Sequence, residues 1–319
     1  MGEDSQNSLE VSVSLPQVTG TINVRGITIL FGPPGSGKTW ILKSIFGALY
    51  SAKNKIVPSE FSLLRGGLSV SIRRGVEEVR LYCADESEGV NCSYEGNVGV
   101  RPLYVPSFAE AIIKYLWAPP YESYEEFRKL VIKYITRPTP KPSCDLSNYQ
   151  SLIEKLGGWY RFKKVSVQLY ELVDRQRRSE LLIQGSSSTV ARLGFLENAA
   201  GFLLKEYDLL LLDDPEAGLH PKAVMRLAAF LHTLASCGIN ILVATHSPHF
   251  VDMLNRMDNI ADIYEVKLET APLSLYVVVD GKIKEYDLLS SYIEDYTEYL
   301  LAPYMRPEDY RKFLKSAKP

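Results

Sequence analysis

The spacing of apolar residues changes along the chain, from a period of two to the spacings of helices and buried strands. Apolar and polar residues alternate over 9–31 and again over 61–96, where glycine-rich turns interrupt the alternation. Because the side chains of a strand point alternately to its two faces, the pattern predicts strands in the first segment and an antiparallel sheet in the second.

Helical spacing begins after this predicted sheet. Residues 107–117 and 121–135 carry apolar residues at helical intervals, a proline-rich connector follows at 137–143, and a further helix is expected at 148–156. We interpret this region as a helical insert, which a strand pair follows over 162–184.

Helix and apolar strand then alternate from 188 to 245, which is the order of a parallel α/β sheet. A hairpin with an Asp-Gly turn is expected over 276–286, and two helices over 288–302 and 307–315. The predicted fold class is therefore α/β, with a mixed or parallel core, an antiparallel β-subdomain and a helical insert. The expected parts of the chain are 1–106 with the β-subdomain, the insert 107–160, the second half of the core 161–270 and a final part 271–319.

The segment GPPGSGKT lies between a strand-like run and a helix-like run. It matches the phosphate-binding pattern G-x-x-x-x-G-K-[ST], in which glycines let backbone N–H groups turn inward around phosphates. A helix that begins at Lys38 adds the positive end of its dipole. We expect Lys38 to reach the β- and γ-phosphates of a nucleoside triphosphate and the Thr39 hydroxyl to bind Mg²⁺. The residues expected to bind the nucleotide are Gly32, Pro33, Pro34, Gly35, Ser36, Gly37, Lys38 and Thr39.

A leucine-rich strand over 209–212 ends in two acids, Asp213 and Asp214. A buried strand that carries acids at its carboxyl end suits a magnesium–nucleotide site. Asp213 is the expected magnesium ligand, and Asp214 is the expected base that orients and deprotonates water. Without the phosphate loop, a strand that ends in an Asp-Pro turn would be the simpler interpretation.

The next strand, 239–248, contains Thr245 and His246 near its end. A histidine there can hydrogen-bond a γ-phosphate and sense its loss, although the alternative is an ordinary hydrogen-bonded polar residue. The other histidines are interpreted as a loop contact, a helix-surface residue and a loop residue, in the order His220, His232 and His249.

Three serines precede a helix that is expected to begin near Thr189. Hydroxyls and free N–H groups at a helix start form a candidate anion site, and a plain helix cap is the alternative. These serines are Ser186, Ser187 and Ser188.

The composition is that of a soluble globular protein, because 46% of the 319 residues are hydrophobic and 23% are charged. No apolar run is long enough to span a membrane, so we expect no membrane attachment. A net charge of −2 excludes a chain-wide attraction to nucleic acid. Basic clusters at 73–74, 161–164 and 175–178 are either phosphate contacts or solvated faces.

The four cysteines are scattered and form no C-x-x-C pair. We therefore expect reduced cysteines, no zinc site and a cytoplasmic location. They are Cys83, Cys92, Cys144 and Cys237.

The order of the motifs resembles a known group of proteins. A phosphate loop, a serine-rich helix start, LLLLDDPEAGLHP and VATHSP follow one another, as in the ABC-type ATPase heads of the SMC, RecF and DNA-repair group. The last two motifs are similar to the DEPE…LHP and THSP of small ATPases related to the OLD (overcoming lysogenization defect) family. The similarity covers 9–50 and 180–250 well, the β-region by arrangement only, and the insert and the final part poorly.

This resemblance implies ATP and Mg²⁺ as cofactors and an ATP-dependent homodimer, in which each subunit closes the nucleotide site of the other. The roles that it implies are a γ-phosphate cap for 186–188, magnesium binding for Asp213, the base for Asp214, a γ-phosphate switch for His246 and a place at the dimer seam for 218–220.

Three features depart from the pattern of that group. Its usual glutamate after the magnesium acid is Asp214 here, one methylene shorter, so hydrolysis is expected to be slow unless Glu216 substitutes. Where that group has its signature glycine, this chain has Ser188. No glutamine occurs between Thr39 and Tyr149, so the glutamine loop is absent or replaced around PLYVPS.

The predicted function is an ATPase that acts as a nucleotide-driven dimerisation switch, with a DNA or protein partner in DNA maintenance or antiviral defence. The alternatives are a P-loop phosphotransferase, such as a nucleotide kinase, and an ATPase subunit that works with a separate nuclease. Residues 247–319 hold no acidic metal constellation of the kind a nuclease needs. A transporter ATPase is disfavoured, because the L-S-G-G-Q signature is missing.

Overall fold

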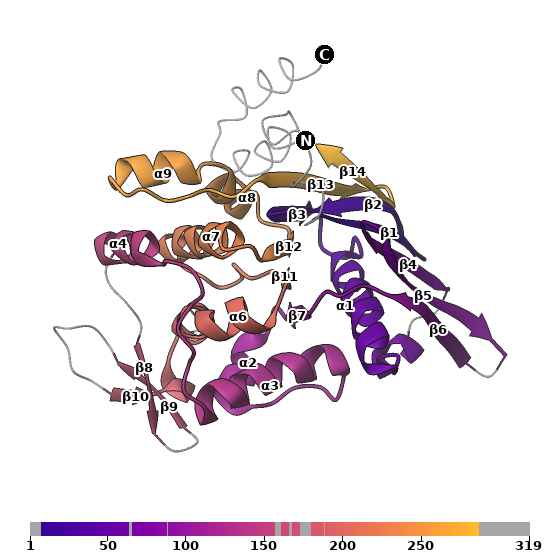
Figure 1. Cartoon of the computed structure of the whole chain (residues 1–319), viewed down its shortest axis with the longest axis horizontal. Coiled ribbons are helices and arrows are strands. Elements are labelled where there is room, and N and C mark those ends of the chain that lie inside the picture. Colours follow the sequence, from indigo (N-terminus) through magenta and orange to yellow (C-terminus); the bar gives the residue numbers. More distant parts are fainter. Residues whose placement is uncertain are drawn as a thin grey trace, which may run out of the picture.

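The apolar segments pair into one long sheet in the computed structural model (Figure 1), which describes residues 8–63, 66–87, 89–156, 161–165, 168–172, 180–187 and 189–286. The strands of this sheet are β1 (Leu9–Leu15), β2 (Val18–Val24), β3 (Ile27–Phe31), β4 (Leu68–Arg74), β5 (Glu77–Glu86), β6 (Gly89–Asn97), β7 (Pro102–Val105), β11 (Leu209–Asp213), β12 (Asn240–Thr245), β13 (Leu273–Val279) and β14 (Lys282–Tyr286). Within the described residues they run in the order β6-β5-β4-β1-β2-β14-β13-β3-β12-β11-β7.

One end of the sheet is parallel and fully covered. Strands β13, β3, β12, β11 and β7 are parallel to one another, and every residue of β3, β11 and β7 is buried. Helices on both faces of a parallel sheet explain why these strands read as continuous apolar runs. The expected parallel core is confirmed.

The other end is antiparallel and has one solvated face. Strands β6, β5, β4, β1 and β2 pair antiparallel in this order, and buried and exposed residues alternate along β1. The side chains of its inner face meet the first helix, α1 (Lys38–Asn54). The expected antiparallel β-subdomain is therefore confirmed, and it continues the same sheet.

The helices pack on both faces of the parallel strands, with α1 on the opposite side from α7 in Figure 1. Those of the insert confirm the expected helical segments. The helices after α1 are α2 (Ala109–Tyr115), α3 (Glu122–Thr136), α4 (Ser147–Leu156), α5 (Phe195–Asn198), α6 (Ala200–Glu206), α7 (Pro221–Ser236), α8 (Pro248–Asn255) and α9 (Met257–Ile263). Within the described part of the chain, none is long and apolar enough to cross a membrane.

A second sheet of three strands follows the insert, in the order β10-β9-β8. It confirms the strand pair expected over 162–184 and adds a third strand. Its members are β8 (Arg161–Val165), β9 (Gln168–Leu172) and β10 (Glu180–Leu182).

The helix expected near Thr189 begins with a π-helical turn, Val190–Gly194, before α5 continues it. The hairpin expected over 276–286 is confirmed as β13 and β14, with left-handed φ angles of 48° at Asp280 and 71° at Gly281. The two helices expected over 288–302 and 307–315 lie outside the described residues.

A buried polar cluster attaches the insert to the core. Arg226 of α7 donates two hydrogen bonds, of 2.5 and 2.6 Å, to the Glu197 carboxylate, and the Tyr149 hydroxyl of α4 donates to the same carboxylate. All three side chains are buried. Because an unpaired charge would be costly at this depth, the cluster fixes α4 against α5 and α7.

The expectation of reduced cysteines is wrong in this structure, because all four form disulfides. Cys83 and Cys92 are directly opposite one another on β5 and β6. Cys144, before α4, is bonded to Cys237 at the end of α7. These pairings remove the argument from reduced cysteines for a cytoplasmic location. The second pair spans 93 positions of sequence, so only the packing of α4 on α7 brings it together.

Cross-linking stabilises a fold mainly by restricting the unfolded chain, and the effect grows with loop length. We expect the double substitution Cys144→Ser/Cys237→Ser to lower the free energy of unfolding by about 2–4 kcal/mol. Cys83→Ser/Cys92→Ser opens a much shorter loop and should cost about 2 kcal/mol less. Urea unfolding of both variants measures the difference, and equal losses would contradict the assignment.

His232 is buried, so its interpretation as a helix-surface residue is wrong. The backbone N–H of Ala271 donates to Nδ1 at 3.1 Å, which places the ring proton on Nε2, where it is donated to the Leu254 carbonyl at 2.9 Å. His220 caps the start of α7, and His249 lies in the first turn of α8. His232 lies on the face of α7 against which α8 packs, and its partner carbonyl, that of Leu254, belongs to α8.

Burial lowers the pKa of His232, against the smaller opposing effects of the Leu254 carbonyl and Asp258. Above its unfolded pKa of about 6.5 the ring is neutral in both states, and below it only the unfolded chain takes up the proton. The free energy of unfolding should therefore fall below pH 6.5, by at most about 1.4 kcal/mol per pH unit from this group. Urea unfolding between pH 7.5 and 5.5 measures it. His232→Gln should show a shallower fall, whereas parallel curves would contradict the prediction.

Candidate nucleotide site

The phosphate loop lies between β3 and α1, as its flanking patterns predict. Gly35 and Gly37 have left-handed φ angles of 80° and 94°. A Cβ on Gly37 would also lie 3.0 Å from Val18 Cγ1 and 3.1 Å from Gln17 Cγ. Both conformation and space therefore favour glycine at the residue before α1.

Lys38 is buried at the start of α1, and its ammonium group turns into the loop. It donates to the carbonyls of Gly32 and Pro33, at 2.7 and 2.8 Å, and to the Ser36 hydroxyl at 3.3 Å. Burial lowers its pKa, although the nearby carboxylates, Asp214 first among them, oppose that change. These acceptors hold the cation where the loop would surround phosphates.

Asp213 and Thr39 meet, as the sequence predicts. The Thr39 hydroxyl donates to both Asp213 oxygens, at 3.0 and 3.1 Å, and the Tyr104 hydroxyl donates to Oδ2 at 2.9 Å. Burial raises the pKa of Asp213, and the two hydroxyl donors oppose that rise. Tyr104 was not singled out from the sequence, although it lies in the PLYVPS segment where a replacement for the glutamine loop was expected.

Asp214 and His246 also come together. His246 Nδ1 lies 2.9 Å from Asp214 Oδ1, and both side chains are partly exposed. Asp214 adopts a left-handed φ of 41°, which Asp tolerates better than most residues, and its N–H donates to the Ala244 carbonyl at 2.9 Å. This turn brings the side chain away from β11 and toward the end of β12.

Glu216 lies behind this pair and is buried. One carboxylate oxygen accepts from the Thr245 hydroxyl, and the other has no hydrogen-bond partner among the described residues. Burial raises the pKa of Glu216 to about 7. One carboxylate oxygen of Glu216, one of Asp214 and one ring nitrogen of His246 lie within 4.8 Å of one another.

Lys38, Thr39, Asp214 and His246 border a cavity of about 410 Å³. It is lined by Gln17, Pro34, Gly35, Gly37, Lys38, Thr39, Trp40, Asp214 and His246. The cavity lies at the carboxyl ends of the parallel strands, where α/β sheets bind ligands.

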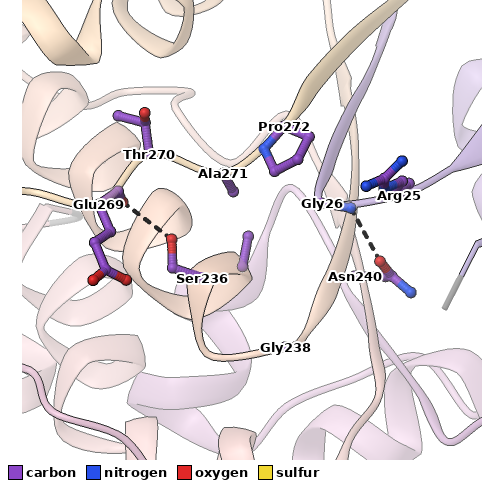
Figure 2. Close-up of a pocket in the computed structure, with 10 residues that line it drawn as sticks. Arg25, Gly26, Ser236, Gly238, Asn240, Glu269, Thr270, Ala271 and Pro272 are labelled. Atoms are coloured by element: carbon purple, nitrogen blue, oxygen red, sulfur yellow. Dashed lines mark hydrogen bonds between the residues drawn. The ribbon is translucent and has the colours of Figure 1, made fainter. Parts of the chain in front are cut away.

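A larger cavity of about 610 Å³ lies at the opposite ends of the same strands (Figure 2). Gly26, just before β3, donates to Asn240 Oδ1 at 3.1 Å, and the Ser236 hydroxyl donates to the Glu269 carbonyl at 3.1 Å. Its larger volume does not make it the candidate site, because the phosphate loop and the acids lie at the other ends of these strands.

Comparisons with known proteins show what the fold of this chain is similar to. The family described as "AAA domain, putative AbiEii toxin, Type IV TA system" matches residues 161–252. A solved SMC head bound to the C-winged helix domain of ScpA matches over 89% of this chain and 98% of that one, with 15% identity and a TM-score of 0.50. The SMC head domain from Thermotoga maritima matches over 88% and 99%, with 12% identity and a TM-score of 0.48. A search of curated proteins found no match.

The chain has the fold of an ABC/SMC-type P-loop ATPase. The likeness to the OLD family stays a prediction.

Within this ATPase fold, Arg192 of the π-helical turn is a site residue that sequence reasoning missed. Its buried guanidinium donates to the carbonyls of Asp214, Pro215 and Ala217, at 3.4, 3.3 and 3.0 Å, and to the carbonyl of Ser107. It therefore shapes the loop that carries the acids. Its spacing along the chain offered no signal, because its partners are carbonyls from two other segments.

The serine-rich element is only partly placed as expected. The Ser186 hydroxyl is buried and donates to the Ile183 carbonyl at 2.6 Å, which is at odds with a γ-phosphate cap. The Ser187 oxygen is on the surface, where it accepts from the N–H of Val190 at 3.3 Å as a helix cap does. Ser188 lies outside the described residues. This geometry leaves Ser187 as the candidate cap.

One of the three basic clusters can be judged from the described side chains. Arg73 pairs with Glu78 at 3.0 Å and with Glu10 at 3.7 Å, so its charge is balanced locally. The side chains of 161–164 and the segment 175–178 lie outside the described part of the structure. The described cluster therefore favours a solvated face over a phosphate contact.

Proposed function

We propose that this chain binds Mg·ATP, hydrolyses it slowly and uses ATP to join two copies of itself. The observation that carries the proposal is the convergence of Lys38, Thr39, Asp214 and His246 on one cavity, with Asp213 bonded to Thr39 beneath it. Asp214 and His246 come from segments outside the phosphate loop. Their convergence with Lys38 and Thr39 is therefore evidence beyond the loop motif.

The residues present fit both a magnesium ion and the phosphates of ATP. The Thr39 hydroxyl and the Asp213 carboxylate supply the oxygen ligands that Mg²⁺ prefers, and they already lie within 3.1 Å of one another. Lys38 and the N–H groups at the start of α1 would hold phosphate oxygens. A bound magnesium ion would neutralise charge on the phosphates.

Asp214 is the better placed of the two candidate bases. It lines the cavity, whereas Glu216 is buried and does not. In the proposed reaction Asp214 accepts a proton from the water that attacks the γ-phosphate, and His246 holds the Asp214 carboxylate at 2.9 Å. The short Asp side chain is the reason to expect slow turnover. Glu216 would support the loop through Thr245.

Two surface features support closure by a second copy. Gly218 has a left-handed φ of 72° and open space where a Cβ would stand, and His220 beside it is exposed. Ser187 is exposed on another loop. A twin subunit could therefore approach 218–220 and place Ser187 on a γ-phosphate, so that hydrolysis would release the pair. A DNA or protein partner would then respond to this dimerisation.

We expect Asp214→Asn to lower kcat for ATP hydrolysis by about 100-fold, because general-base catalysis is worth at least that much. The affinity for Mg·ATP should stay within about threefold, since Lys38, Thr39 and Asp213 remain. ATP should convert the variant to a longer-lived dimer. Release of phosphate and ADP measures turnover, and light scattering after size exclusion measures mass.

Asp262→Asn, an exposed acid on α9, is the matched control and should behave as wild type. A brisk wild-type rate that Asp214→Asn leaves unchanged would refute the assigned base. If ATP never changes the mass, the dimer proposal fails. ADP formed without phosphate, in the presence of a second small substrate, would instead identify a phosphotransferase.

A further inference from the structure

Four buried side chains and the exposed Thr39 form a circuit that α1 closes beneath the candidate nucleotide site. Thr39 and Lys43 lie one turn apart on α1 and therefore point to the same side of that helix. Thr39 contacts Asp213 at the end of β11, and Lys43 contacts Tyr124 in the first turn of α3. Tyr104 on β7 joins Asp213 to Tyr124.

The first half of the circuit surrounds the magnesium ligand. Tyr104 is 1% exposed and donates to Asp213 Oδ2 at 2.9 Å. Because a carboxylate only accepts hydrogen bonds, the Tyr104 hydroxyl is the donor in this pair. Asp213 is thereby held between donors from α1 and β7.

The second half reaches the helical insert. The rings of Tyr104 and Tyr124 lie 5.9 Å apart at 45°. Lys43 Nζ donates to the Tyr124 hydroxyl at 2.7 Å and also lies 4.5 Å from the centre of its ring. Lys43 is only 7% exposed, so Tyr124 gives this buried cation both a hydrogen bond and a cation–π contact.

None of these contacts can be given up without cost. A buried donor or acceptor that loses its partner pays the full cost of its desolvation, and a buried charge pays more. If Asp213 shifts, Tyr104 must either follow it or leave its own hydroxyl unpaired. A shift of Tyr104 also changes the contact of its ring with the Tyr124 ring. The circuit is therefore a physical connection between the expected magnesium ligand and α3.

We propose that Tyr104 is the positioning residue of Asp213, and that the Tyr104–Tyr124 contact transmits the state of the nucleotide site to α3 and hence to the insert. This inference rests on the proposed binding of Mg·ATP. It also gives a role to the PLYVPS segment, in a chain with no glutamine between Thr39 and Tyr149.

Tyr104→Phe tests the first step, because it keeps the ring and removes only the hydroxyl. ATP binding is followed by calorimetry at increasing Mg²⁺, and again in EDTA. We expect the half-saturating Mg²⁺ concentration to rise about 10-fold, as for other residues that orient a metal ligand, with ATP affinity in EDTA unchanged. Tyr50→Phe, near the far end of α1 and outside the circuit, is the matched control and should leave the Mg²⁺ requirement unchanged.

Tyr124→Leu, which removes the ring that contacts Tyr104, tests the second step by hydrogen exchange of the amides in 122–136. In wild type, Mg·ATP should slow this exchange. Tyr124→Leu should keep the wild-type Mg²⁺ requirement and lose the response in α3. Tyr124→Phe, which keeps the ring and removes only the hydroxyl bonded to Lys43, is the matched control and should retain the response. Melting temperatures without nucleotide establish that each variant is folded.

The outcomes separate the two proposals. If wild type binds no ATP at any Mg²⁺ concentration, the proposed function fails. If wild type binds Mg·ATP but Tyr104→Phe has an unchanged or lower Mg²⁺ requirement, only the positioning role fails. An α3 response that survives Tyr124→Leu overturns the transmission.

Discussion

A carboxylate buried between two hydroxyl donors is the interaction on which this ATPase fold depends at its site. Asp213 ends a strand that is covered on both faces, so its charge can be tolerated there only with partners. Thr39 supplies one partner from the helix that follows the phosphate loop, and Tyr104 supplies the other from the neighbouring strand. Three elements are thereby fixed around the point where a magnesium ion is expected.

The charges around this point are poorly solvated. Burial lowers the pKa of Lys38 and raises those of Asp213 and Glu216, so each group is held in surroundings that disfavour its charged form. Such a cluster is typical of functional sites. A ligand that brings both phosphate oxygens and a divalent cation would supply opposite charges to both kinds of group.

The insert is attached to the core by two different means. Near α4, a disulfide between Cys144 and Cys237 and the buried Tyr149–Glu197–Arg226 cluster make the attachment firm. At the start of α3, attachment runs through hydrogen bonds and ring contacts that end at the nucleotide site. One end of the insert is therefore anchored, while the other contacts Lys43 of α1 and Tyr104 of β7.

The sequence by itself determined the parallel core, the antiparallel β-subdomain, the phosphate loop and the meeting of Thr39 with Asp213. These follow from local periodicity and from the rule that parallel strands deliver their carboxyl ends to one edge. Only the tertiary structure decided the rest. The burial of His232 and Glu216, the Cys144–Cys237 bond, the carbonyl contacts of Arg192 and the place of Tyr104 all depend on segments distant in sequence. Hydrogen-bond partners of this kind leave no periodic trace, because any polar group of the right reach would serve, and packing alone selects which one is there.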